Sequence, residues 1–263
     1  MDLEIQGNTA LVSASSSGLG KASAMALAQE GANVVINGRD RERLDGAVAD
    51  VQEVATGTVI GQQGDITNED DISTLVERTL DEFGGIDHLV TSAGGPPSGA
   101  FMDTTDEDWD HAHELLLMSV VRLVREFAEP LRADGGGTIV NITSRSVKEA
   151  IPPIALSNTV RMGVVGLEKT LSREFAPEVR ANAVLPGPHE TDRVRSLVED
   201  AVERGEYDSY EEGITDRADS VPVGKLGDPM GLGKTVAFLS APCSEFINGT
   251  TVTIDGGLGR ATL

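Results

Sequence analysis

Cysteine, aromatic residues and long apolar runs are all scarce in this sequence. The single cysteine, Cys243, cannot form a disulfide within the chain, and no histidine or second cysteine stands beside it to bind a metal. Aromatic residues make up only 3% of the chain, so we expect a core of Val, Ile, Leu and Ala. No apolar run is long enough to cross a bilayer and the first residues do not form a signal peptide, which favours a cytoplasmic protein without a membrane partner.

Positive charge is also scarce, because 43 acidic residues oppose 21 basic ones and give a formal net charge of −22. An acidic surface repels phosphate backbones and anionic headgroups, so we expect neither nucleic acid nor a membrane surface as a partner. The acidic residues are spread through the chain rather than gathered in a tail, which favours a halophilic protein adapted to a salt-rich cytoplasm. An acidic protein of ordinary salinity is the alternative interpretation.

Short β-rich runs alternate with longer segments of helical period, which is the pattern of repeated βαβ units. We therefore predict a single α/β domain over 1–263, with a Rossmann-type, doubly wound parallel sheet of about seven strands and helices on both faces. The expected strands are Thr9–Ser13, Asn33–Ile36, Val59–Gln62, Ile86–Thr91, Thr138–Thr143, Arg180–Leu185 and Thr251–Ile254. The expected helices are Gly20–Glu30, Arg41–Val54, Glu69–Phe83, Asp106–Arg132 and Ile154–Phe175.

The segment 192–224 is strongly acidic, only partly helical in period, and holds both tyrosines of the chain, Tyr207 and Tyr210. It follows a predicted strand at the sheet edge where open α/β sheets bind ligands, so we interpret it as a mobile lid over a substrate. A solvated surface excursion without a chemical role is the alternative interpretation.

A glycine-rich turn, Ser13–Gly20, joins the first predicted strand to the following helix. Its backbone N–H groups and the helix N-terminus favour an anion, and a pyrophosphate suits the turn. The residues expected to contact a dinucleotide here are Ser13, Ser15, Ser16, Ser17, Gly18, Leu19 and Gly20. A tight connection that needs glycine only for its own backbone is the alternative.

After the second strand, Arg39 stands where an acidic residue would otherwise bind the ribose 2′-hydroxyl of the cofactor. Arginine pairs with a 2′-phosphate instead, so we favour NADP(H) over NAD(H) as the cofactor. An exposed arginine paired with Asp40 or Glu42 is the alternative.

Further motifs follow in order: Gly64–Thr67, Thr91–Gly94, Pro186–Asp192 and Asn248–Gly257. With the glycine-rich turn, in which Ala14 replaces a glycine, they resemble the short-chain dehydrogenase/reductase family over about positions 5–257, and 3-oxoacyl-(acyl-carrier-protein) reductases in particular. The resemblance implies cofactor contacts from Asp65, Ile66, Ser92, Ala93, Gly94, Arg161, Pro186, Gly187, His189 and Thr191, and no metal. Asp65 as a cap of the next helix is the alternative.

The catalytic positions that the resemblance implies depart from the family's residues. Family members use a serine, a tyrosine thirteen residues later and a lysine four residues after that, and here Ser144 leads to Ser157 and Arg161. Serine is a much weaker acid than a phenol, whereas Arg161 still holds ribose hydroxyls and supplies positive potential. The family's relay asparagine falls near Leu116 or Leu117, where no amide exists.

A different proton donor is therefore expected. Lys148 follows Ser144 on a loop beside the expected substrate pocket, and a partly buried lysine near another cation gives up its proton more readily. An exposed Lys148 paired with Glu149 is the alternative. Tyr207 or Tyr210, carried in by the lid, is a further candidate.

The resemblance implies an NADP(H)-preferring oxidoreductase that interconverts the carbonyl and secondary alcohol of a small molecule, such as a 3-oxoacyl, sugar or alcohol substrate. A cofactor-binding sensor or scaffold without redox chemistry, and a lyase or dehydratase, are the alternatives. The apolar stripe with Val160 and Val164 exceeds the needs of one sheet face, and the family's assemblies imply a homodimer or homotetramer. Ordinary core packing is the alternative explanation of the stripe.

Overall fold

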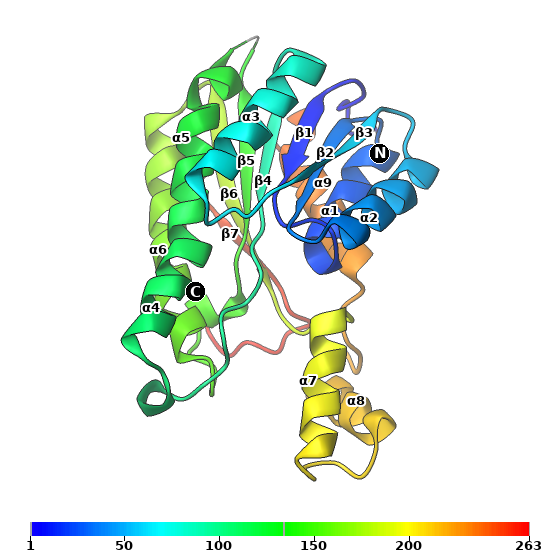
Figure 1. Ribbon diagram of the computed structural model, residues 1–263, viewed down its shortest axis with the longest axis vertical. Helices are drawn as coiled ribbons and strands as arrows, with labels where there is room; N and C mark the ends of the chain where they lie inside the picture. Colours follow the sequence, from blue (N-terminus) through cyan, green and yellow to red (C-terminus); the bar gives the residue numbers. More distant parts are fainter. Residues whose placement is uncertain (1, 134, 263) are drawn as a thin grey trace.

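The computed structural model describes residues 2–133 and 135–262. Its sheet has seven parallel strands in the order β3-β2-β1-β4-β5-β6-β7, which confirms the predicted Rossmann-type fold (Figure 1). The strands are β1 (Thr9–Val12), β2 (Asn33–Gly38), β3 (Val59–Gln63), β4 (His88–Thr91), β5 (Gly137–Ile142), β6 (Val179–Pro186) and β7 (Thr251–Ile254).

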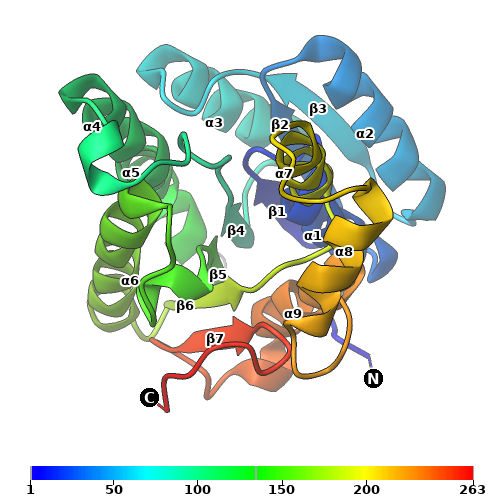
Figure 2. The ribbon, with the colours of Figure 1, turned by 90° about the horizontal axis from the view of Figure 1, so that it is seen from below.

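Helices cover both faces of the sheet, with α1, α2 and α9 on one side and α3 to α6 on the other (Figures 1 and 2). The α-helices are α1 (Gly18–Gln29), α2 (Arg41–Val54), α3 (Glu69–Phe83), α4 (Asp106–His113), α5 (Ser119–Arg132), α6 (Ala155–Glu174), α7 (Asp192–Glu203), α8 (Tyr210–Asp219) and α9 (Pro229–Ser240). Among the described residues, none of these helices combines the length and apolarity needed to cross a bilayer.

The side chains of β1 alternate between two cores. Ala10 and Val12 belong to the core beneath α1 and α9, whereas Leu11 belongs to the core beneath α3, α5 and α6. Successive residues of a strand point to opposite faces, so a strand covered on both faces must be apolar at every position. All three residues are fully buried, which explains why the strands of this protein are continuous apolar runs.

The structure differs from the helix predictions in two places. The helix expected over Asp106–Arg132 contains a π-helical turn, Glu114–Met118, which separates α4 from α5. The periodicity also fails to predict α9, because its two glycines lower the helix propensity of the segment. Asp228 and Pro229 are the signals that mark this helix: the Asp228 side chain accepts a hydrogen bond from the backbone N of Met230 at 2.9 Å, and Pro229 occupies the first turn.

The predicted lid segment, 192–224, forms α7 and α8, which project from the body of the molecule on the side of the strands' carboxyl ends (Figure 1). The two helices pack on each other through a small contact, in which Gly213 leaves room for Val198 and for the ring of Tyr207. The Tyr207 hydroxyl donates a hydrogen bond to Asp216 at 2.8 Å. The segment is thus a helical hairpin, and its movement as a lid stays a prediction.

The carboxyl group of Glu168, a residue of α6, is buried in the protein. The residue is only 1% exposed, and Oε1 has no hydrogen-bond partner among the described residues. Burial raises the pKa of Glu168 to about 7, because the charged form loses its hydration, and the neighbouring Lys169 opposes this effect only in part. The folded protein therefore holds a proton on Glu168 at pH values where an exposed glutamate has lost it.

We predict that Glu168 destabilises the folded protein as the pH rises. Its pKa is about 4.5 when exposed and about 7 when folded, so the folded state binds more protons between these values. The contribution of protonated Glu168 to the free energy of unfolding is therefore complete below pH 4.5. It falls between pH 4.5 and about 7, and it stays constant above that value. The Glu168→Gln variant should lack the fall and gain about 1–3 kcal/mol of unfolding free energy near pH 8.

Denaturant unfolding at several pH values measures this effect. Glu174→Gln, an exposed position at the end of the same helix, is the matched control and should keep the wild-type dependence on pH. If wild type and Glu168→Gln lose stability equally as the pH rises, the buried carboxyl is not its source.

Candidate active site

A cavity of about 610 Å³ opens at the carboxyl ends of the strands, where the strand order reverses between β1 and β4. Open parallel sheets bind ligands at this switch point. Figure 2 shows this edge of the sheet from the side on which α7 and α8 project. The cavity walls come from the turn after β1, the loop after β4, the start of α6 and the start of α7.

Hydrogen bonds from two buried serines fix the turn after β1. The Ser13 hydroxyl donates to the carbonyl oxygen of Ser92 at 2.7 Å and accepts from its N–H at 2.9 Å. The Ser15 hydroxyl donates to Val12 O at 2.5 Å and accepts from Asn37 N at 3.1 Å. Neither serine lines the cavity, so the prediction that Ser13 and Ser15 contact the cofactor is corrected: their hydroxyls bind the backbone and brace the turn.

The rest of the turn does line the cavity, namely Ser16, Ser17, Gly18, Leu19 and Gly20. A Cβ at Gly20 would lie 2.7 Å from the carbonyl oxygen of Ala14, so only glycine lets α1 start this close to the strand. Ala14 has a φ of 44° and therefore adopts the left-handed conformation that glycine adopts more readily.

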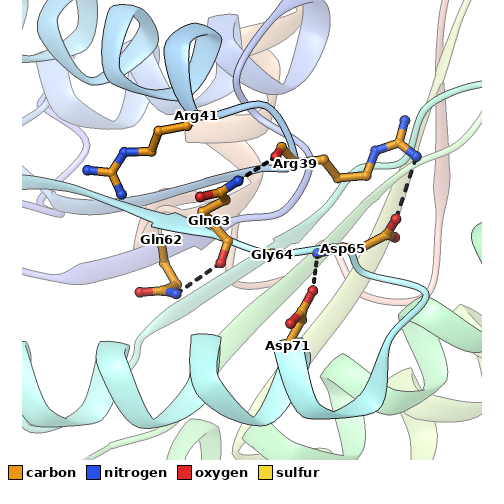
Figure 3. Close-up of a pocket in the computed structure, with 7 residues that line it drawn as sticks. All are labelled: Arg39, Arg41, Gln62, Gln63, Gly64, Asp65 and Asp71. Carbon is orange, nitrogen blue, oxygen red and sulfur yellow. Dashed lines mark hydrogen bonds and ion pairs between the residues drawn. The ribbon is translucent and has the colours of Figure 1, made fainter.

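Arg39 follows β2 and lines the cavity together with Asp65 and Ile66. Its guanidinium lies 3.6 Å from the Asp65 carboxylate, not beside Asp40 or Glu42, which corrects the alternative pairing. A side pocket of about 510 Å³ adjoins this ion pair and is lined by Arg39, Arg41, Gln62, Gln63, Gly64, Asp65 and Asp71 (Figure 3).

Hydrogen bonds and charge hold Asp65 in its ionised form. Burial by itself raises the pKa of Asp65, but hydrogen bonds from the backbone and hydroxyl of Thr67, at 2.9 and 2.8 Å, outweigh it, and the charge of Arg39 adds to them. The pKa of Asp65 is lowered as a result. Asn68, not Asp65, caps α3 by accepting from the N–H groups of Asp70 and Asp71.

The predicted catalytic positions meet on one wall of the cavity. Ser144, Ser157 and Arg161 all line it, the first at the end of β5 and the other two in the first turns of α6. The Arg161 Nε donates to the Ser157 hydroxyl at 3.1 Å, and Nη2 donates to the carbonyl oxygen of Gly94 at 3.1 Å. Leu116 is buried in the π-helical turn and offers no polar atom to the cavity.

Arg161 remains a cation in this setting. Burial, and second to it the positive charge of Arg193, lower the pKa of Arg161 to about 10, which leaves the guanidinium protonated near neutral pH. Arg161 therefore supplies positive potential and hydrogen bonds to the cavity and does not deliver a proton.

The other predicted cofactor residues also line the cavity: Ser92, Ala93, Gly94, Pro186, Gly187, His189 and Thr191. The ring of His189 is nearly buried, with Nδ1 3.0 Å from the carbonyl oxygen of Gly187 and the ring face against Gly227. This packing holds the ring in place, and the expected contact between the backbone at 189 and a nicotinamide stays a prediction.

The structure does not bring Lys148 to the site. Its side chain is exposed at the end of a 3₁₀ turn and does not line the cavity, so the interpretation of Lys148 as a partly buried proton donor is wrong. The alternative pairing with Glu149 is corrected as well, since Glu149 lies 3.6 Å from Arg145. Tyr207 and Tyr210 belong to the α7–α8 hairpin and do not line the cavity either.

The residues that line the cavity and that sequence reasoning missed include Arg43, His111 and Arg193. His111 and Leu115 are four residues apart and line the cavity from one face of the helix, a spacing that is visible in the sequence. Arg193 stands two residues after Thr191, in the first turn of α7. Its position close to the Pro-Gly motif is the feature of the sequence that could have indicated a place in the cavity wall. Within the described chain, no group of three or more His, Cys, Asp or Glu side chains gathers as a metal site would require.

The sequence of this chain is similar to the sequences of known oxidoreductases. The family model described as enoyl-(acyl carrier protein) reductase matches residues 13–259. Uncharacterized oxidoreductase YvrD of Bacillus subtilis is 31% identical over 99% of this chain and 100% of the relative. The 3-oxoacyl-(acyl-carrier-protein) reductase FabG of Thermotoga maritima is 29% identical over 97% of this chain and 99% of the relative.

Solved structures agree with the sequence matches. L-Sorbose reductase from Gluconobacter frateurii, complexed with NADPH and L-sorbose, has a TM-score of 0.95 at 28% identity and covers 99% of this chain and 100% of that chain. Actinorhodin polyketide ketoreductase with NADPH has a TM-score of 0.90 at 30% identity, over 97% of this chain and 98% of that chain. The similarity thus extends over the whole domain and includes proteins bound to a nicotinamide cofactor.

Proposed function

The chain belongs to the short-chain dehydrogenase/reductase family, and from this membership we propose that it is an NADP(H)-preferring oxidoreductase that interconverts a carbonyl and a secondary alcohol with a proton donor other than tyrosine. One observation carries the proposal: Ser144, Ser157 and Arg161 line the same cavity as the glycine-rich turn and Arg39. The residues present suit a dinucleotide, since the turn Ser16–Gly20 lines the cavity at the N-terminus of α1, and Arg39, whose side chain is exposed, lines it as well.

In this proposal, different residues of the chain bind the cofactor and orient the substrate. A reduced nicotinamide supplies the hydride when it is bound. The Ser144 hydroxyl orients the substrate carbonyl, and Arg161 holds ribose hydroxyls and stabilises the negative charge that develops on the carbonyl oxygen. The turn Ser16–Gly20 and Arg39 hold the phosphates.

His111 is the proton donor in this proposal. Of the two histidines that line the cavity, His189 has its ring packed against Gly227, whereas His111 stands on α4 with an exposed side chain. As the donor, His111 would deliver one proton to the carbonyl oxygen, and a bound reduced nicotinamide would supply the hydride to the carbonyl carbon, which gives a secondary alcohol and the oxidised cofactor.

A second candidate function is cofactor binding without redox chemistry, as in a sensor or scaffold. The observation that favours it is that Ser157 stands where the family has a tyrosine and that Leu116 or Leu117 stands where it has the relay asparagine. A lyase or dehydratase that uses the cofactor transiently is a third candidate on the same observation. Binding of NADPH without consumption separates these two candidates from the oxidoreductase.

We further propose a homodimer or homotetramer in a salt-rich cytoplasm. Val164 of the apolar stripe lies in the core, which accounts for part of the stripe, but Met162 on the same helix is 52% exposed and suits a contact with another subunit. The net charge of −22 supports the salt-rich environment.

The activity itself is tested by NADPH consumption with a panel of aldehydes, ketones and oxo acids. We expect turnover with some member of the panel and a loss of about 100-fold or more in kcat for Arg161→Ala, because a preorganised charge at the reacting oxygen is removed. Arg161→Lys should keep part of the activity. A wild-type protein that binds NADPH and consumes none with the whole panel would support the sensor instead.

The cofactor preference is tested at Arg39. Arg39→Ala should raise the KM for NADPH by about 10- to 100-fold, since a charge-assisted hydrogen bond to the 2′-phosphate is lost, and leave the KM for NADH nearly unchanged. Arg41→Ala is the control from the same pocket, because Arg41 binds Asp45 at 3.0 Å. Equal changes for both cofactors in Arg39→Ala would contradict the preference.

The proton donor is tested by the rate of ketone reduction. His111→Gln should lower kcat by about 100-fold, because the variant has no side chain at this position that gives up a proton. Lys148→Ala, outside the cavity, should behave as the wild type. The reverse result, with Lys148→Ala inactive and His111→Gln unaffected, would restore the lysine as the donor.

A further inference from the structure

Arg193 crosses the cavity from α7 to the loop after β4. Its Nη2 donates to the carbonyl oxygen of Pro96 at 3.4 Å. The guanidinium carbon lies 2.9 Å from the position that a Cβ of Gly95 would take, so the flat group rests on the backbone of this glycine. A side chain at position 95 would displace the guanidinium, and the loop therefore has the form that Arg193 requires.

Arg161 reaches the same loop from α6. Its Nη2 donates to the carbonyl oxygen of Gly94 at 3.1 Å, two residues before the carbonyl that Arg193 binds. Two guanidinium groups from different helices thus converge on Gly94–Pro96. Their proximity is also seen in the pKa of Arg161, which the charge of Arg193 helps to lower.

Carboxylates do not neutralise this pair. Within residues 2–133 and 135–262, no Asp or Glu oxygen lies within 4.0 Å of either guanidinium, including that of Asp192, which lines the cavity next to Arg193. By contrast, Arg39 and Arg145 each lie 3.6 Å from a carboxylate. In a chain with a net charge of −22, two neighbouring cations without an acidic partner form a local site for an anion.

The position of the pair separates it from the phosphate end of the cavity. The pyrophosphate-binding turn faces Thr191, whose Cγ2 lies 3.8 Å from the position of a Cβ at Gly18. The guanidinium groups lie instead at the loop after β4, and Arg161 is bonded to Ser157 at the predicted catalytic position. An anion bound by Arg193 next to Arg161 therefore lies beside the reacting groups.

We propose that Arg193 binds the carboxylate of the substrate, with the positive charge of Arg161 beside it, so that the protein interconverts an oxo acid and the corresponding hydroxy acid. The planar guanidinium pairs with a carboxylate through two parallel hydrogen bonds, which fixes the orientation of the carbonyl to be reduced. Val194 and Leu197 line the cavity beside Arg193 and provide apolar contact for a short carbon chain. This assignment rests on the proposed function: the hydride adds to the carbonyl carbon, the proton to its oxygen, and the carboxylate is unchanged.

Substrate kinetics with matched pairs test the assignment. Each oxo acid of a panel is compared with its primary amide, which has the same shape and no charge. The wild type should prefer the acid, and Arg193→Met should lower kcat/KM for the acid by about 10- to 100-fold while leaving the amide and the KM for NADPH unchanged. Arg195→Met is the matched control, since Arg195 lies on the same helix, pairs with Glu190 at 3.7 Å and does not line the cavity.

Binding measurements distinguish the sources of the anion. Calorimetric titration of the cofactor-free protein with malonate should show binding that Arg193→Met loses, and titration with inorganic pyrophosphate should show binding that it keeps. If Arg193→Met instead loses pyrophosphate and raises the KM for NADPH, the pair holds the cofactor and the assignment is overturned. Equal kcat/KM for acid and amide in the wild type also overturns it.

The two proposals fail in different ways. Loss of malonate binding in Arg193→Met, without turnover of any carbonyl by the wild type, supports the carboxylate site and overturns the redox function. Turnover of neutral ketones alone, with Arg193→Met equal to wild type, supports the redox function and overturns the carboxylate site.

Discussion

The two hydrogen bonds between the Ser13 hydroxyl and the backbone of Ser92 determine where the cavity begins. They join β1 to β4 just beyond the last paired residues of the two strands, at 2.7 and 2.9 Å. At this point the chain turns to α1 on one face of the sheet and to α4 on the other, so a crevice opens between the diverging loops. The loop Gly94–Pro96, which both cavity arginines contact, continues directly from Ser92 and is positioned by the same bonds.

The protein carries an excess of negative charge, whereas two neighbouring positive side chains, Arg161 and Arg193, line the cavity. A net charge of −22 repels anions at long range, whereas Arg161 and Arg193 attract them at short range. Salt screens the long-range repulsion between exposed charges more strongly than it weakens a contact inside a partly buried cavity.

The sequence predicted the sheet and the cavity walls because both depend on local pattern. Apolar strands such as Ala10–Val12 and the motif Ser16–Gly20 are readable in the order of residues. The direction in which a side chain points depends on the tertiary structure. For this reason the predictions that Ser13, Ser15 and Lys148 reach the cavity were wrong. His111 and Arg193 were missed for the same reason, since each lines the cavity only because of where its helix lies in the folded protein.

The substitutions at the catalytic positions depend on one another. Arg161 Nε donates to the Ser157 hydroxyl, so the guanidinium stem lies back over the helix toward position 157. Ser157 is only 8% exposed in this packing. Removal of Arg161 would in turn leave Gly94 O without its donor and Arg193 without its neighbouring cation. The serine and the arginine thus form one hydrogen-bonded arrangement at the two positions where the family has a tyrosine and a lysine.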